Sequence, residues 1–199
     1  EGGYLDISVV DASAVWIGGR YGTIIRTLDG GATWDRQDRL SAGGSLSVVN
    51  AVYGIHFRDR TNGCVVGLGY LRHHTTNGGA TWSPSALTGT SLGAGTTSYY
   101  SLTFLTPLEG WVRVNSVEGT TVRNGILHTT DGGVTWQLVP AVSDQNVYDL
   151  SFATSNAGWG AWEESLLRTE DGGRTWAPQA RPGSDVLRGV FFLPATRTG

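Results

Sequence analysis

The stretch Thr27-Leu28-Asp29-Gly30-Gly31-Ala32-Thr33-Trp34 decides the fold, because it recurs three more times without a gap. The other copies are Thr75-Thr76-Asn77-Gly78-Gly79-Ala80-Thr81-Trp82, Thr129-Thr130-Asp131-Gly132-Gly133-Val134-Thr135-Trp136 and Thr169-Glu170-Asp171-Gly172-Gly173-Arg174-Thr175-Trp176. Their terminal Trp residues are 48, 54 and 40 positions apart. A unit of this length that repeats along a chain is typical of propellers and solenoids.

Three short strand-like runs precede each copy, and the residues after its Trp form a fourth. We name these strands A to D. Strand A is expected at residues 5–10, 52–57, 100–104 and 147–152, with a fifth copy at 186–193; strand B at 15–18, 64–67, 111–114 and 159–162; strand C at 24–26, 71–74, 126–128 and 166–168. Turn residues separate the runs, so each unit reads as a four-stranded antiparallel sheet.

The repeat predicts an all-β fold, a β-propeller of four-stranded antiparallel blades. We place its blades at about 4–40, 48–87, 99–140 and 146–180, with the start of a further blade at 185–199, in one domain over 1–199. A sandwich lacks such a period, and solenoid repeats are usually shorter. Seven blades of this size would need roughly 330 residues. We therefore expect about four and a quarter blades of a larger propeller.

The repeated stretch has the chemistry of a tight turn between strands C and D. The Asp carboxylate can accept local backbone N–H bonds, and two glycines can adopt positive φ. In the second copy Asn77 replaces the Asp and keeps the side-chain acceptor without the charge. Such a replacement is expected if the residue caps a turn and would be surprising if it took part in catalysis. The turn residues and their ring anchors are Asp29, Trp34, Asn77, Trp82, Asp131, Trp136, Asp171 and Trp176.

These turns resemble the Asp-box (bacterial neuraminidase, BNR) repeats of sialidases, some glycosidases, sortilin-type receptors and the photosystem II assembly and stability factors. The repeat pattern is most similar to the last group, as the run from Trp16 to Trp34 illustrates. The resemblance implies a non-catalytic protein-binding scaffold that assembles or stabilises a photosynthetic membrane complex from the lumenal or periplasmic side. It also implies an Arg-rich patch, an exported and membrane-peripheral protein, and turns that lie away from the ligand.

Long irregular stretches are expected at the B–C and D–A connections, and long loops on a rigid scaffold commonly carry binding sites. The candidate partner-binding residues there are Arg20, Arg36, Arg39, Tyr70, Arg123, Trp162 and Arg181. Arg beside exposed aromatic rings is typical of protein interfaces. The alternative is that these Arg are solvated charges paired with nearby acids such as Asp35 and Glu118.

The leading alternative function is a secreted glycosidase of the sialidase or xyloglucanase kind, or a glycan-binding propeller with rings that stack on sugars. Glu163 and Glu164 are adjacent, so on a strand they point to opposite faces and make a poor acid/base pair. A sialidase typically carries an Arg-Ile-Pro segment, which this sequence lacks. We therefore expect no enzyme and assign no catalytic residue.

The amino-acid composition restricts the kinds of partner and site that the chain can have. The chain of 199 residues has 14 basic residues, all Arg, against 17 acidic ones, a net charge of −3 that argues against nucleic acid. No apolar run is long enough to cross a membrane. Cys64 aligns with the strand-B Trp of the other repeats and is expected to be a small buried side chain. We expect no cofactor and no metal site, and protein as the partner.

Overall fold

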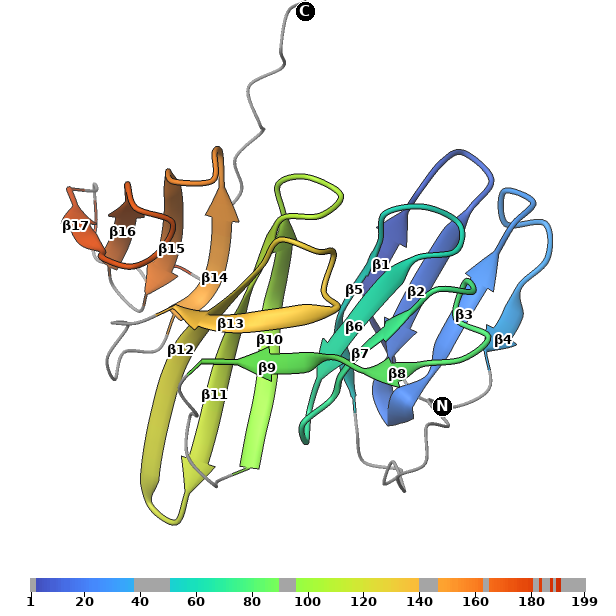
Figure 1. The fold of residues 1–199 in the computed structure, drawn as a ribbon. Helices are drawn as coiled ribbons and strands as arrows, with labels where there is room; N and C mark the ends of the chain where they lie inside the picture. The colour runs from blue at the N-terminus through green and yellow to red at the C-terminus, as the bar shows by residue number, and fades with distance from the viewer. Residues whose placement is uncertain are drawn as a thin grey trace, which may run out of the picture.

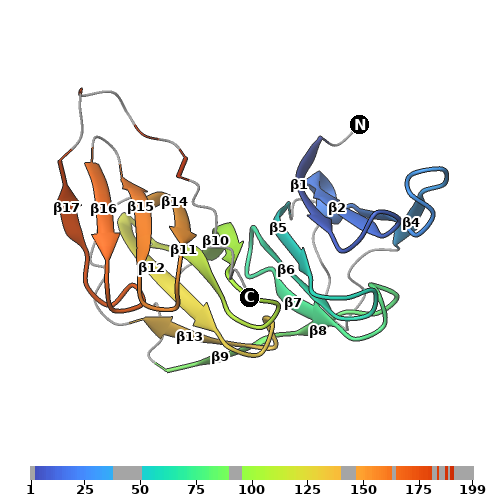
Figure 2. The same ribbon diagram turned by 90° about the horizontal axis from the view of Figure 1, so that it is seen from above.

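The computed structural model describes residues 3–37, 51–89, 96–139, 147–162 and 165–180, with residues 183, 187, 189 and 190. These residues form four antiparallel sheets, which lie side by side along an arc (Figures 1 and 2). Blade 1 contains β1 (Tyr4–Val9), β2 (Val15–Gly19), β3 (Ile24–Thr27) and β4 (Asp35–Gln37). Blade 2 contains β5 (Val52–Phe57), β6 (Gly63–Gly67), β7 (Arg72–Thr75) and β8 (Ser83–Pro84).

The remaining strands build two more blades and a connection. Blade 3 contains β10 (Thr96–Phe104), β11 (Gly110–Glu118), β12 (Thr121–Thr129) and β13 (Thr135–Val139). Blade 4 contains β14 (Val147–Phe152), β15 (Gly158–Trp162), β16 (Ser165–Thr169) and β17 (Ala177–Gln179). β9 (Ala86–Thr88) links blades 2 and 3. The predicted propeller blades are thus confirmed, with strand A (β1, β5, β10, β14) on the inner side of the arc (Figure 2).

One predicted loop is regular structure instead. The B–C insertion at 115–124, expected to be irregular, continues β11 and β12 into a long hairpin, in which Glu118 pairs with Thr121. Residues 35–37, directly after Trp34, form β4 and pair with β3, as expected for strand D. The difference at 115–124 arises because local polar composition suggests a loop, whereas cross-strand pairing in the folded sheet satisfies the backbone.

Two of the blade interfaces share one arrangement, in which a strand-B Trp stacks on a Phe of the next blade and donates a hydrogen bond to that blade. Trp16 of β2 stacks on Phe57 of the next blade with centroids 4.1 Å apart, and its Nε1 donates to the Gly78 carbonyl oxygen at 3.1 Å. Trp111 stacks on Phe152 at 3.7 Å and donates to Gly172 at 3.3 Å in the same way. Trp16 and Trp111 are therefore the core of the interfaces of blade 1 with blade 2 and of blade 3 with blade 4.

Blades 2 and 3 meet without such a ring. Cys64 occupies the Trp position and is fully buried, as expected from the alignment. Gly133 lies so close that a Cβ on it would be 2.6 Å from the Cys64 sulfur. A glycine at this point of the turn lets the two blades approach across a small side chain.

β9 adds a further connection at the outer rim of blades 2 and 3. After the two residues of β8 the chain leaves blade 2, and β9 pairs in parallel with β13 (Figure 1). The buried Ser85 donates from Oγ to the Gly133 carbonyl at 2.6 Å. Blade 3 is thus a five-stranded sheet whose outermost strand comes from its neighbour.

None of the described part of the chain forms a helix that is long and apolar enough to cross a membrane.

Candidate functional site

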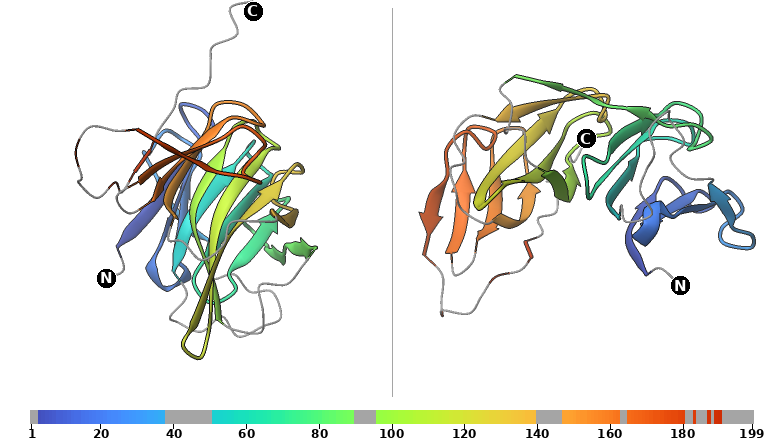
Figure 3. Two further views of the ribbon diagram at one scale, coloured as in Figure 1. Left: turned by 90° about the vertical axis from the view of Figure 1, so that its left-hand side faces the viewer. Right: turned by 90° about the horizontal axis from the view of Figure 1, so that it is seen from below.

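The two ends of the blades carry different kinds of connection. Each C–D turn donates a glycine N–H to the A–B turn of its own blade, as Gly30 does to Ser13 and Gly132 does to Leu108. A–B and C–D turns therefore share one face, which we call the turn face, at the top of Figure 1. The described B–C turns and the N-terminal ends of the inner strands lie at the opposite face, the loop face, which the right panel of Figure 3 shows from below.

The C–D turns are self-contained hydrogen-bond networks. In the first, Thr27 Oγ1 donates to Asp29 Oδ1 at 2.7 Å and accepts the Gly31 N–H at 2.8 Å, while Thr33 donates to both Asp29 oxygens. In the second, Asn77 accepts from the Thr81 N–H and donates to its hydroxyl at 2.8 Å. The Asp, Asn and Thr side chains of these turns are hydrogen-bonded to groups of the same turn. This indicates a structural role for the turns.

The turn carboxylates are stabilised in their charged form. Hydrogen bonds from Thr33 and Thr27 lower the pKa of Asp29 to about 2. Burial raises the pKa of Asp131, but donors from Thr135 and Thr129 outweigh it, and the net pKa is lowered. A group held this firmly as a charged acceptor is poorly suited to exchange protons with a substrate near neutral pH.

The predicted partner-binding residues do not form one patch. Arg20 lies in the 3-10 turn between β2 and β3, and Arg123 lies on β12, two blades away; both are exposed on the loop face. Tyr70 is 53% exposed in the B–C turn of blade 2. Arg36 lies on β4 rather than in a loop, with a guanidinium nitrogen 3.5 Å from Thr23 Oγ1.

The structure does not describe the side chains of the other three predicted partner-binding residues. Arg39 and Arg181 lie outside the described residues, as do Glu163 and Glu164. Trp162 ends β15, and its side chain lies outside what the structure describes. These residues stay predictions.

A row of tyrosines on the inner strands is a feature that sequence reasoning missed. Tyr53, Tyr100 and Tyr148 each lie four positions before the strand-A Phe of blades 2, 3 and 4. The rings of Tyr53 and Tyr100 stack with centroids 5.0 Å apart. The strand direction puts all three at the loop-face end of the inner strands. Their fixed offset from the Phe was the signal in the sequence that would have found them.

Arg113 extends this row across blade 3. It pairs with Tyr100 across β10 and β11, and its guanidinium carbon lies 4.7 Å from the centroid of the Tyr100 ring. Burial lowers the pKa of Arg113, and the nearby phenols of Tyr100 and Tyr148 oppose that effect. The electron-rich face of the Tyr100 ring attracts the guanidinium and helps to hold Arg113 beside the row.

A pocket of about 310 Å³ lies beside the row, between blades 1 and 2. It is lined by side chains that are apolar or aromatic apart from one arginine: Leu5, Arg20, Tyr21, Ala51, Tyr53 and Leu68. Leu5 occupies the position in blade 1 that Tyr53 has in blade 2. The pocket therefore forms the blade 1 end of the aromatic row. Arg20, one of the predicted partner-binding residues, lies in its wall.

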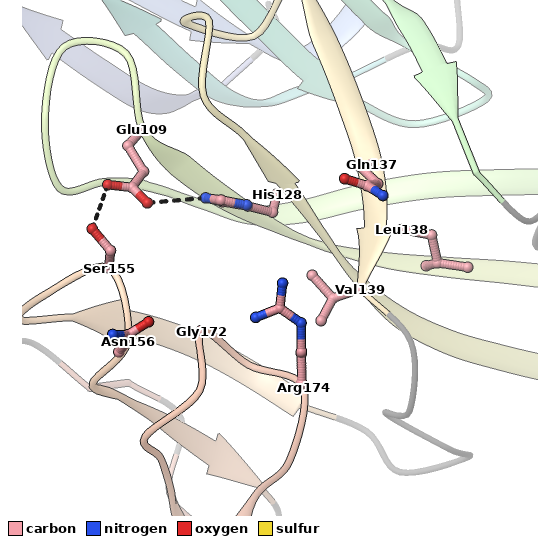
Figure 4. A pocket seen from close by; sticks show the side chains of 9 residues that line it. All are labelled: Glu109, His128, Gln137, Leu138, Val139, Ser155, Asn156, Gly172 and Arg174. Atoms are coloured by element: carbon pink, nitrogen blue, oxygen red, sulfur yellow. Dashed lines mark hydrogen bonds and ion pairs between the residues drawn. The ribbon is translucent and has the colours of Figure 1, made fainter.

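A second pocket, of about 340 Å³, lies on the turn face between blades 3 and 4 (Figure 4). Glu109 accepts from Ser155 Oγ at 2.7 Å, and its other oxygen is 3.2 Å from His128 Nε2. The acid thus lies between the Ser and the His, whereas nucleophile activation needs the His to contact the Ser. The trio bridges two blades and does not form a hydrolytic triad.

The remaining titratable groups have structural surroundings. Burial and the charge of Asp131 raise the pKa of the Cys64 thiol to about 12, which makes it a poor nucleophile. His56 stacks on Phe104 at 3.8 Å, and burial lowers its pKa to about 4. Within the described ranges, no three His, Cys, Asp or Glu side chains are grouped as metal ligands.

Acidic pairs of the glycosidase kind are not found in the pockets described. The pocket between blades 3 and 4 holds Glu109, and the one formed by the inner strands of blades 1 to 3 holds Asp6. A third, at the outer edge of blade 4, holds Glu170, and the described lining of the loop-face pocket includes no acid. Glycoside hydrolysis needs two carboxyl groups across one bond.

Comparison with known proteins gives the fold. No protein-family model matches the sequence, and no curated protein matches it. Among solved structures, YCF48 bound to a D1 peptide matches with a TM-score of 0.67 and 23% identity, over 97% of this chain and 58% of that one. YCF48 from Cyanidioschyzon merolae matches with a TM-score of 0.51 and 15% identity, over 88% of this chain and 71% of that one. The GH74 xyloglucanase from Xanthomonas campestris has 0.60 and 14%, over 87% of this chain and 29% of that one.

Proposed function

We propose that this chain is a non-catalytic protein-binding propeller that assembles or stabilises a photosynthetic membrane complex. The observation that carries the proposal is the aromatic row of the loop face, where Tyr53, Tyr100 and Tyr148 follow the inner strands with Arg113 beside them. Tyrosine and arginine are enriched among the residues that dominate protein–protein binding energy. The row lies opposite the turn face, where the Asp and Asn side chains of the C–D turns are hydrogen-bonded within their own turns.

Two likenesses indicate the partner class. The repeats resemble those of photosystem II assembly factors, and the fold is similar to that of YCF48 bound to a D1 peptide. We infer that the loop face receives a segment of a reaction-centre subunit. Such an encounter belongs on the lumenal or periplasmic side, so the protein is exported and peripheral to the membrane.

The glycosidase alternative has less support. GH74 enzymes share the propeller, but fold alone does not carry an activity. Among the described residues, those that line the aromatic pocket of the loop face include no carboxylate that could act as acid or base. We therefore place the function in binding rather than hydrolysis.

The test is direct binding to peptides that tile the water-exposed segments of D1, measured by fluorescence polarisation. We expect at least one segment to bind with a Kd of about 100 µM or tighter. Tyr100→Ala should weaken that binding by roughly 10-fold or more, since it removes a ring of the row. Arg174→Ala, on the turn face, is the matched control and should leave the Kd unchanged.

Two results would contradict the proposal. One is that no D1 segment binds in this range. The other is that the chain releases reducing sugar from xyloglucan at a rate that Tyr100→Ala abolishes, which would assign a glycan-active site to the same row.

A further inference from the structure

At two of the three interfaces between the described blades, an arginine of one blade donates to the C–D turn of the next. Arg26 Nη1 donates to the Gly78 carbonyl oxygen at 2.9 Å, and the same oxygen accepts the indole N–H of Trp16. Between blades 2 and 3, Arg58 Nη1 donates to the Asp131 carbonyl oxygen at 3.2 Å. The backbone carbonyl groups of these turns are therefore acceptors for a guanidinium group that comes from outside the turn.

The interface between blades 3 and 4 has no such arginine among the described residues. His128 occupies the position that Arg26 has in blade 1, since each directly precedes the first Thr of its C–D turn and pairs with the strand-B Trp. The Gly172 carbonyl oxygen is the counterpart of the Gly78 oxygen and accepts the Trp111 indole N–H at 3.3 Å. Within the described chain, no guanidinium donates to it.

The turn-face pocket of Figure 4 lies where these side chains are missing. In blade 1 the space beside Arg26 is also filled by Gln37, which is buried and whose amide oxygen, suitably oriented, accepts from Arg26 Nε at 3.0 Å. The counterpart of Gln37 in the β12–β13 pairing is the shorter, apolar Val139. His128, Val139 and Gly172 all line the pocket of about 340 Å³. The pocket therefore corresponds to the space that Arg26 and Gln37 fill between blades 1 and 2.

A carboxylate borders this pocket. Glu109 directly precedes strand B, where blade 1 has Ala14. Its side chain is 19% exposed, and within the described residues His128 supplies the one basic nitrogen at ion-pair distance. Each of its oxygens has one contact, to Ser155 or to His128, which leaves lone pairs for further donors. The pocket thus has a mostly buried acid where the corresponding interface has its own arginine.

Arg174 is the other fully charged residue of the described lining. Its Nη1 donates to the Asp171 carbonyl oxygen of its own turn at 3.0 Å, and its side chain is exposed. No ion pair joins Arg174 to Glu109. Because water screens an exposed charge, Arg174 weakens the attraction of the pocket for a cation without cancelling it.

We propose that the pocket between blades 3 and 4 binds the guanidinium group of an arginine side chain from a partner polypeptide. The group takes the place of Arg26 and donates to Glu109 and to the Gly172 carbonyl oxygen. Its carbon stem lies along Leu138 and Val139, which line the same pocket. A planar guanidinium donates to two acceptors at once, whereas an ammonium group is a point charge. The site lies on the turn face, so it is separate from the aromatic row and does not rest on the function proposed for it.

The probe is N-acetylarginine amide, which presents the side chain without charged ends. Heteronuclear NMR follows the indole N–H of Trp111, because that group shares the Gly172 carbonyl oxygen with the incoming donor. We expect a Kd of about 1 mM or tighter. N-acetylcitrulline amide has nearly the same shape without the charge and should bind roughly 10-fold more weakly.

Charge variants test the role of the carboxylate. Glu109→Gln should weaken binding of the arginine probe roughly 10-fold. Glu170→Gln is the matched control, because Glu170 is 74% exposed in a C–D turn of the same interface and is absent from the pocket lining. It should leave the Kd unchanged. Arg174→Ala should bind the probe as tightly or more tightly, since it removes a like charge.

A filled pocket provides a second, independent test. The double variant His128→Arg with Val139→Gln restores the pair that blade 1 has at this position. Arginine already occupies the position of His128 in blades 1 and 4, as Arg26 and Arg168, so the fold accommodates it. We expect the double variant to keep or raise the Tm and to lose the binding of the arginine probe.

Several outcomes would overturn the inference. No shift of the Trp111 indole at about 10 mM probe shows that the pocket holds only water. Equal binding of the arginine and citrulline probes, or unchanged binding by Glu109→Gln, excludes recognition of the charge. Binding that persists in the filled double variant places the probe elsewhere, and a clear preference for free L-arginine would assign a small molecule. Tyr100→Ala should leave this binding unchanged, so the two sites succeed or fail separately.

Discussion

Asn77 shows that the C–D turn needs an acceptor rather than a charge. Its Oδ1 accepts the Thr81 N–H at 2.9 Å, as the Asp29 carboxylate does from Thr33. The amide then donates to the threonine hydroxyl, so the same bond persists with its direction reversed. What the turns of blades 1 and 2 share is therefore the hydrogen-bond geometry, which either Asp or Asn can provide.

We therefore expect Asp131→Asn to cost less than about 1 kcal/mol of unfolding free energy. Asp131→Ala should cost about 1–3 kcal/mol, because the hydroxyl of buried Thr129 and both donors of Thr135 lose their acceptor. Urea denaturation at pH 7 measures both variants. Asn77→Asp, the reverse change in blade 2, is the control and should be nearly neutral. A large loss in Asp131→Asn would show that the charge itself is required.

His56 makes stability depend on pH between neutrality and about pH 5. Burial lowers its pKa from 6.5 to about 4, so below pH 6.5 the unfolded chain binds a proton that the folded chain excludes. The folded state is favoured fully above pH 6.5 and loses this contribution as the pH falls toward 4. The loss at pH 5 is about 2 kcal/mol.

His56→Phe keeps a ring against Phe104 and has no proton to bind. Urea denaturation at pH 7 and pH 5 should show a smaller loss for this variant than for the original chain. The turn carboxylates provide an internal check: their lowered pKa values maintain their stabilising contribution above about pH 4, so they change little in this window. Equal losses in the two proteins would contradict the assignment to His56.

At the scale of elements, blade 1 is joined to blade 2, and blade 3 to blade 4, through strand B of the first and strand A of the second. Trp16 and Trp111 each supply a ring for the stack and an indole N–H for the next C–D turn. Short side chains on the inner strands add a second link. Asp6 accepts the Ile55 N–H at 2.8 Å, and Ser101 accepts the Leu150 N–H at 3.1 Å. These contacts fix each of these pairs of neighbouring blades against sliding along their strands as well as against moving apart.

Trp111→Leu should lower the unfolding free energy by about 3–5 kcal/mol, because it removes a fully buried ring and leaves the Gly172 carbonyl without its donor. Cys64→Ala, at the same position of blade 2, should cost about 1 kcal/mol, since little volume is lost. Chemical denaturation followed by Trp fluorescence compares the two. Similar losses would show that the stack is not the main link between blades.

At the scale of the whole molecule, the first blade has one covered face and one open face. Blade 2 covers the side of Trp16, whereas Ile7 and Val9 on the other side are 57% and 63% exposed. Trp34 is 43% exposed although its counterparts Trp82 and Trp136 are buried. The arc of Figure 2 explains the difference, because no described blade precedes blade 1.

Equivalent substitutions should therefore differ in effect. Trp34→Ala should cost less than about 1 kcal/mol in this chain, and Trp82→Ala about 3–5 kcal/mol, as expected for an exposed and a buried ring. Thermal and urea unfolding of the two variants provide the measurement. A loss in Trp34→Ala as large as that in Trp82→Ala would show that its exposed face is covered in solution.

Much of this architecture could be predicted from the repeat. The inner strands β5 and β14 have the bounds expected for them, and the blades follow the spacing of the boxed Trp residues. The long β11–β12 hairpin and β9 could not be predicted, since their sequences are polar or short. The hairpin arises from local pairing of β11 with β12, whereas β9 pairs with β13, which lies alongside it only once blades 2 and 3 are packed together.

The sequence by itself determined the repeating unit, because turn chemistry and alternating strands act over a few neighbouring residues. Only the tertiary structure decided which side chains share a surface. Tyr53 and Tyr100 are 47 positions apart and stack because blades 2 and 3 are packed side by side, while Arg20 and Arg123 lie on blades that blade 2 separates. The positive φ of Tyr21 and Tyr70 was equally invisible, since a backbone angle follows from how the whole turn is held between its strands.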